Sequence, residues 1–166
     1  MQFSNLKIYQ PDGTFRTGSL AVADDRILAA GETGDAVDMD GLYAIPGLVD
    51  LHFHGCMGRD FCDGTKGSDF CDAGAEHIET MSAYLGGEGV TAFCGTTMAF
   101  DEPILTNIFN IAKPYINKET GGAVLRGINM EGPFISEKKK GAQNGAYLHA
   151  PDAAMFRRVQ AQANGL

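Results

Sequence analysis

Residues 46–55 have the sequence PGLVDLHFHG. Pro46 and Gly47 interrupt the preceding pattern, and an apolar run of strand length follows at once. His52 and His54 stand two residues apart near the end of this run, and alternate residues of a strand point to the same face. We therefore expect two imidazoles side by side at the carboxyl end of a strand, where Gly55 lets the backbone turn away. Neutral imidazoles at this spacing suit a divalent transition metal, although two histidines can also be packed or exposed there by chance.

Strands and helices alternate after this motif. Apolar runs at residues 90–94 and 123–130 are typical of strands, and residues 69–85, 102–115 and 152–163 have helical spacing. Such alternation predicts an α/β fold with a parallel sheet covered on both faces. About three β/α units fill residues 46–166, whereas a complete eightfold barrel needs about 250 residues. A truncated barrel is the favoured interpretation, and a small open three-stranded sheet is the alternative.

Residues 1–45 have a different pattern, with short strands separated by turns. The expected strands are residues 3–9, 19–22 and 26–30, and Pro11-Asp12-Gly13 and Asp24-Asp25 mark the turns between them. We expect a small β domain at residues 1–45, followed by the α/β domain at residues 46–166.

A second motif, NMEGPF at residues 129–134, also ends an apolar run. A carboxylate at the end of a buried strand costs several kcal/mol if it is desolvated alone, so a cation or a hydrogen-bond donor should lie beside it. Glu131 is therefore the third candidate metal ligand, and a solvated loop carboxylate is the alternative. The loop KKKGAQNG at residues 138–145 offers N–H groups, amides and positive charge to an anionic, hydroxyl-rich ligand. Gln143 and Asn144 are better candidates for contact than any one lysine, and a charged surface loop is the alternative.

Composition excludes several functional classes. The net charge is −8, with 13 basic and 21 acidic residues, so no basic face is expected to bind nucleic acid. No run approaches the about 20 apolar residues that span a bilayer, and Met1 is not followed by a signal-peptide pattern, so we expect no membrane partner and a cytoplasmic location. The four cysteines form no C-x-x-C pair, and reduced thiols are expected.

Together these motifs resemble the amidohydrolase superfamily, in which PGLVDLHFHG is similar to the first-strand motif. Residues 89–93 (GVTAF), 96–98 (TTM) and 130–134 (MEGPF), which runs into KKGAQ, resemble the N-acetylglucosamine-6-phosphate deacetylases in particular. The resemblance covers essentially the whole chain. It implies that residues 46–166 are the first part of a (β/α)8 barrel, and that residues 1–45 are part of a small β-sandwich completed from near the C-terminus.

By position, the resemblance implies that His52, His54 and Glu131 are metal ligands. It implies substrate contacts near Ala142 and Gln143, where many relatives have histidine in place of Gln143. The metal would be zinc, iron or cobalt, with one or two ions, and it would activate water. The implied reaction is the deacetylation of N-acetylglucosamine 6-phosphate, a small amino-sugar phosphate, to glucosamine 6-phosphate and acetate.

The family takes two further histidine ligands and an aspartate acid/base from later strands, and this chain contains none of them. We therefore expect the 166 residues alone to be inactive. An opened barrel exposes a strand edge and apolar surface, which favours a homo-oligomer or a second polypeptide. Two alternatives remain: another amidohydrolase, such as a dihydroorotase or a urease-like enzyme with a carbamylated lysine, or a non-catalytic module that binds a metal or a sugar phosphate.

Overall fold

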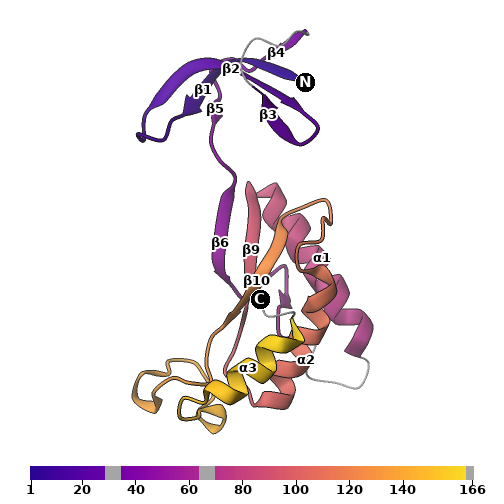
Figure 1. Cartoon of the computed structure of the whole chain (residues 1–166), viewed down its shortest axis with the longest axis vertical. Helices are drawn as coiled ribbons and strands as arrows, with labels where there is room; N and C mark the ends of the chain where they lie inside the picture. Colours follow the sequence, from indigo (N-terminus) through magenta and orange to yellow (C-terminus); the bar gives the residue numbers. More distant parts are fainter. Residues whose placement is uncertain (29–34, 64–69, 164–166) are drawn as a thin grey trace. The chain divides into compact units, whose positions relative to one another are not determined.

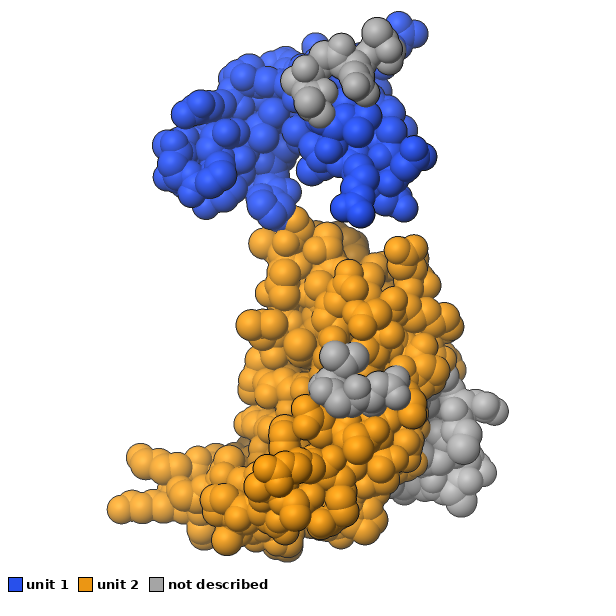
Figure 2. Space-filling view, in the orientation of Figure 1, with its two compact units in different colours: residues 1–46 blue, residues 47–166 orange. Residues whose placement is uncertain are grey.

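The computed structural model describes residues 1–28, 35–63 and 70–163. The chain forms two compact units, Met1–Pro46 and Gly47–Leu166 (Figure 2). The ends of two expected elements lie outside the described residues: Ala29 and Ala30 of a strand, and Asp69 at the start of a helix.

The first unit is a small β-sheet. Strands β1 (Gln2–Tyr9) and β2 (Phe15–Ala23) form an antiparallel hairpin, and β3 (Arg26–Leu28) pairs with the far edge of β2. Strands β4 (Ala36–Asp38) and β5 (Tyr43–Ala44) both pair with β1 in parallel. The three strands expected from the sequence are present, with β2 longer than predicted, and β4 and β5 are additions. Leu6 and Ala21 are its buried apolar side chains among the described residues.

The second unit contains a parallel sheet with the order β10-β9-β6 (Figure 1). Its strands are β6 (Leu48–Phe53), β9 (Val90–Thr97) and β10 (Val124–Met130), so the three predicted strands are confirmed. Because β9 lies in the middle and all three run the same way, their carboxyl ends meet at one edge of the sheet. This edge receives the side chains of both sequence motifs.

In the described part of the second unit, α-helices accompany this sheet. Helix α1 (Phe70–Gly87) and helix α2 (Glu102–Ala112) enclose a core with the sheet around Phe93 and Met81, both fully buried. Helix α2 continues into the short 3-10 helix Lys113–Tyr115, and α3 (Ala153–Gln162) packs against α2. The carboxylate of Asp152 accepts hydrogen bonds from the first N–H groups of α3, as its position before the helix predicts. None of the described helices is both long and apolar enough to cross a membrane.

The expectation that both faces of every strand are covered fails for β6. Leu48, Val49 and Leu51 are 50%, 61% and 66% exposed. Strand β6 is an edge strand that pairs only with β9 within the described sheet, and the core around Phe93 and Met81 lies on the face toward the helices. An apolar run of strand length therefore identified the strand but not its degree of burial.

Candidate metal centre

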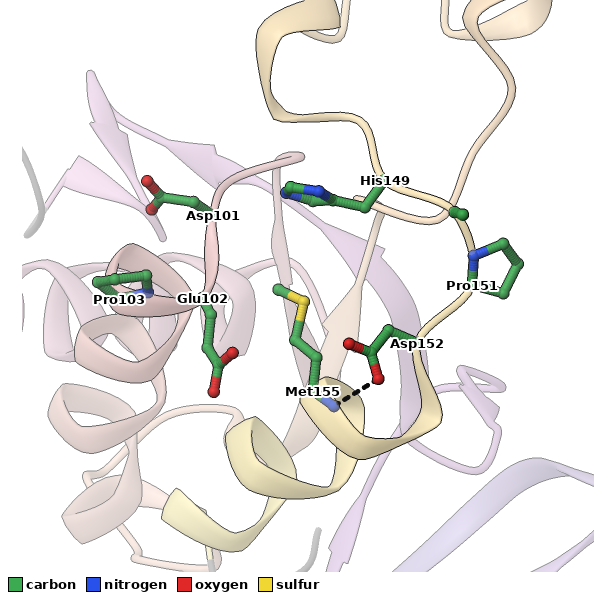
Figure 3. A pocket seen from close by; sticks show the side chains of 8 residues that line it. Asp101, Glu102, Pro103, His149, Pro151, Asp152 and Met155 are labelled. Carbon is green, nitrogen blue, oxygen red and sulfur yellow. Dashed lines mark hydrogen bonds between the residues drawn. The ribbon is translucent and has the colours of Figure 1, made fainter.

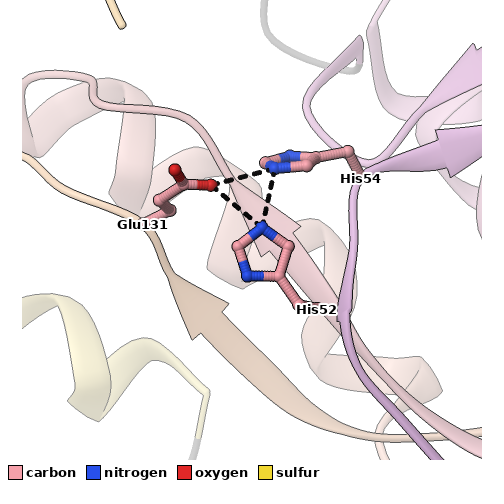
Figure 4. A group of neighbouring side chains, drawn as sticks. All are labelled: His52, His54 and Glu131. Carbon is pink, nitrogen blue, oxygen red and sulfur yellow. Dashed lines mark hydrogen bonds and ion pairs between the residues drawn. The ribbon is translucent and has the colours of Figure 1, made fainter. Parts of the chain in front are cut away.

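The two sequence motifs converge at the carboxyl edge of the sheet. His52 belongs to β6, His54 follows its end, and Glu131 follows the end of β10 (Figure 4). The Oε2 atom of Glu131 lies 2.9 Å from Nε2 of His54 and 3.1 Å from Nε2 of His52. The two Nε2 atoms are 3.2 Å apart. Residues separated by 77 positions are thus brought together by strand order alone.

These three side chains fit a metal ion. Among the described His, Cys, Asp and Glu side chains, they form a group whose ligand atoms all lie within 4.8 Å of one another. Ligand atoms about 2.1 Å from a tetrahedral metal lie about 3.4 Å apart, so these atoms need only a small outward movement to surround one. Two imidazoles and a carboxylate suit zinc, iron or cobalt. The site is accessible, because the His52 side chain is 55% exposed and that of Glu131 is 35% exposed.

The backbone under His52 is held by side chains. The β6–β9 register is irregular between Asp50 and Phe53. There, Asp50 Oδ1 accepts a hydrogen bond from the His52 N–H at 3.0 Å, and Thr96 Oγ1 accepts one from the Phe53 N–H at 2.9 Å. Asn129 Nδ2 donates to the Leu51 carbonyl at 3.3 Å. Irregular pairing next to a site redirects side chains, and here it coincides with the histidine pair.

A short hairpin borders the site on the side of His54. Strands β7 (Gly55–Cys56) and β8 (Arg59–Asp60) are joined through Met57 and Gly58, both with positive φ. A cavity of about 300 Å³ lies along this hairpin and is lined by His54, Gly55, Cys56, Gly58, Arg59, Asp60 and Asp63. The sequence showed a glycine-rich loop here but did not predict the strands. Cys56 lines this cavity and stands outside the convergent ligand group, and burial raises the pKa of its thiol.

The loop expected to contact substrate makes internal bonds. Gln143 is 4% exposed, its Oε1 accepts a hydrogen bond from the Ala99 N–H at 2.7 Å, and its Nε2 lies 3.7 Å from the Met98 sulfur. Asn144 Oδ1 accepts from the Ala146 N–H at 3.0 Å, at the start of the 3-10 helix Gly145–Tyr147, while Ala142 is exposed. Substrate contact by Ala142, Gln143 and Asn144 stays a prediction.

A larger cavity of about 650 Å³ lies elsewhere, beside the starts of α2 and α3 (Figure 3). It is lined by Asp101, Glu102, Pro103, His149, Ala150, Pro151, Asp152 and Met155. Its acidic side chains are engaged, because Asp101 and Asp152 cap helices and Glu102 pairs with Arg158. His149 and the buried His77 of α1 both lie outside the convergent group.

Two residues that support the site are not among the metal ligands and substrate contacts predicted from the sequence. Asn129 bridges to His52, with its Nδ2 3.2 Å from the imidazole Nδ1, and Thr96 holds the backbone of Phe53. Asn129 stands in the same motif as Glu131, two residues earlier, and that alternation places both side chains on the same face. This spacing was the available signal.

Comparison with known proteins gives a consistent result. No protein-family model matches the chain. The N-acetylglucosamine-6-phosphate deacetylase of Bacillus subtilis is 33% identical over 125 residues, which are 74% of this chain and 29% of that protein. The crystal structure of the deacetylase from Thermotoga maritima superposes with a TM-score of 0.75 at 26% identity, over 95% of this chain and 39% of that one.

A deacetylase from Mycobacterium smegmatis, solved as a mutant in complex with N-acetyl-D-glucosamine-6-phosphate, shares the fold with a TM-score of 0.73 at 20% identity. It matches 99% of this chain and 41% of its own. The chain thus spans less than half the length of these relatives. The resemblance inferred from the motifs is confirmed: the chain belongs to the family of N-acetylglucosamine-6-phosphate deacetylases.

Proposed function

We propose that this chain is the metal-binding part of a cytoplasmic deacetylase that converts N-acetylglucosamine 6-phosphate to glucosamine 6-phosphate and acetate. The observation that carries the proposal is the convergence of His52, His54 and Glu131, in a chain related to deacetylases of that name. The structure of the Mycobacterium smegmatis deacetylase, which has a similar fold, contains N-acetyl-D-glucosamine-6-phosphate, and this supports a small amino-sugar phosphate as substrate.

The three side chains would hold a divalent zinc, iron or cobalt ion, with one or two ions in the complete enzyme. When bound, such an ion polarises the acetyl carbonyl and lowers the pKa of water from 15.7 to about 7. The residues of this chain orient the site: Asp50, Thr96 and Asn129 fix the backbone of β6, and the loop with Ala142, Gln143 and Asn144 provides the wall for the sugar. The acid/base aspartate and two further histidines are to come from outside these 166 residues, so the chain alone is inactive.

The proposal includes the architecture. Residues 46–166 would be the first three units of a (β/α)8 barrel, and residues 1–45 one part of a β-sandwich. The exposed apolar side chains of β6 support this, since a further strand paired with that edge would cover them. Without such a strand, the edges of β6 and β10 favour association with another copy, and we expect a homo-oligomer. Light scattering that shows a monodisperse monomer would contradict this expectation.

Metal binding is the first test. Isothermal titration of the purified chain with Zn²⁺ should show one bound ion, and the Glu131→Gln variant should bind about tenfold more weakly or worse, because a neutral amide replaces a charged ligand. His149→Asn is the matched control, because His149 lies in a loop outside the convergent group, and its affinity should equal that of the wild type. Equal zinc affinity for Glu131→Gln and wild type would contradict the site.

Turnover is the second test. The product of the whole reading frame should release acetate from N-acetylglucosamine 6-phosphate, and the 166-residue chain should not. Dihydroorotate and hydantoin serve as alternative substrates, since they represent the cyclic amides that other amidohydrolases open. Acetate release by the purified chain alone would show that the missing catalytic groups are not required. Hydrolysis of a cyclic amide in preference to the sugar would reassign the substrate.

A further inference from the structure

Asn129 makes two contacts with the strand that carries the histidines. It belongs to β10, on the far side of β9 from β6, and its side chain crosses to β6. Its Nδ2 atom lies 3.3 Å from the Leu51 carbonyl oxygen and 3.2 Å from Nδ1 of His52. The amide group has two N–H donors, so it can make both bonds at once. One side chain therefore positions both the backbone and the ring at the first candidate ligand.

This contact, as an N–H···N hydrogen bond, is compatible with only one tautomer of a neutral His52. An amide N–H needs an acceptor, and in a neutral imidazole only one nitrogen is an acceptor. With Nδ1 accepting from Asn129, the proton of the neutral ring is on Nε2. Nε2 in turn lies 3.1 Å from Glu131 Oε2 and 3.2 Å from Nε2 of His54. With the proton on Nε2, that atom has no lone pair for a metal.

We propose that Asn129 is a positioning residue for His52. Its carboxamide presents either an N–H donor or the Oδ1 acceptor to Nδ1 of His52, depending on which ring nitrogen carries the proton. For Nε2 to bind a metal, the proton of the neutral ring must be on Nδ1. The Nε2 proton leaves to water and another proton from water is taken up at Nδ1, so the ring stays neutral. A half-turn of the carboxamide then presents Oδ1 to the Nδ1–H. The Leu51 carbonyl loses its hydrogen bond from Asn129 and accepts one from water. This inference rests on the metal site of the proposed function.

His54 provides an internal comparison. Its Nδ1 atom is buried and has no hydrogen-bond partner among the described residues, whereas His52 has Asn129. Histidine ligands usually donate their second N–H to a fixed acceptor, and loss of that partner typically costs about 10- to 100-fold in metal affinity. Of the two histidines, His52 is therefore the one whose affinity for metal depends on a neighbouring side chain.

Three variants of the whole chain test the role of Asn129. Asn129→Asp has the same shape but only acceptors, so it should favour the Nδ1–H tautomer even without metal and bind Zn²⁺ at least as tightly as the wild type. Asn129→Leu removes both bonds, and its zinc affinity should fall about 10-fold or more. Asn110→Leu is the matched control, because Asn110 is exposed on α2, and its zinc affinity should not change.

The tautomer is read directly by long-range ¹H–¹⁵N spectra of histidine-labelled protein at pH 8. In the wild type, His52 should be protonated on Nε2 without metal and on Nδ1 with zinc. In the Asn129→Asp variant, His52 should be protonated on Nδ1 both with and without zinc. A metal-free wild type already on Nδ1, or an Asn129→Leu variant with zinc affinity within twofold of the wild type, would overturn the inference. If the wild type binds no zinc, the proposed metal site fails, and the metal-free spectra still decide how Asn129 acts on His52.

Discussion

Two adjacent threonines of β9 should respond in opposite ways to the same substitution. Thr96 and Thr97 are both fully buried. Thr96 Oγ1 accepts a hydrogen bond from the Phe53 N–H, whereas Thr97 Oγ1 has no partner among the described residues. Thr96→Val therefore leaves a backbone N–H without its acceptor, which should cost about 1–3 kcal/mol of unfolding free energy. Thr97→Val removes a buried hydroxyl that makes no bond, so it should stabilise the chain by about 1 kcal/mol.

Urea unfolding followed by circular dichroism at 222 nm measures both changes, because the three α-helices belong to the second unit. The chain has no tryptophan, so helical signal is the better probe. Each variant serves as the control for the other, since size, burial and strand are matched. The expected separation between them is about 2 kcal/mol or more. Equal destabilisation by the two substitutions would refute the reasoning, because volume and shape, and not the hydrogen bond of Thr96, would then decide the result.

Two further predictions concern titrating groups. Hydrogen bonds from Arg158 hold the pKa of Glu102 below its ordinary value of 4.5, and a lowered carboxyl pKa stabilises the fold above that value and loses its effect as the pH falls through the lowered pKa. The wild type should therefore lose more stability than Arg158→Met below about pH 4.5, measured by urea unfolding across pH, and parallel curves would contradict this. Burial raises the pKa of Cys62 to about 12, so its thiol should resist iodoacetamide in the native chain at pH 8 and react in urea. Peptide mass spectrometry checks this, and equal labelling in both conditions would count against it.

The sequence predicted what depends on local pattern. The three strands of the second unit and the approach of Glu131 to the histidine pair followed from apolar runs and from the rule that parallel strands end at one edge. The helix expected at residues 152–163 is present as α3, with Asp152 as its cap. These features require only the periodicity of a few neighbouring residues.

Contacts between distant residues could not be predicted in the same way. Gln143 bonds the backbone of Ala99, and no periodic pattern marks that pairing. Alternation places Asn129 on the same face as Glu131, but it does not identify His52, across β9, as its partner. The exposure of Leu51 was also not predictable, because a strand at the edge of a sheet and one at its centre have the same apolar pattern.

The bond between Gln143 and Ala99 has a consequence for protein engineering. A chimera that takes residues 138–145 from a relative with histidine at position 143 would replace Gln143 Oε1, the acceptor of the buried Ala99 N–H, by an imidazole of different shape, whatever the loop contributes to specificity. The segment after β9 and the loop before α3 therefore form one exchangeable module. Recombination libraries should place their crossovers outside both segments.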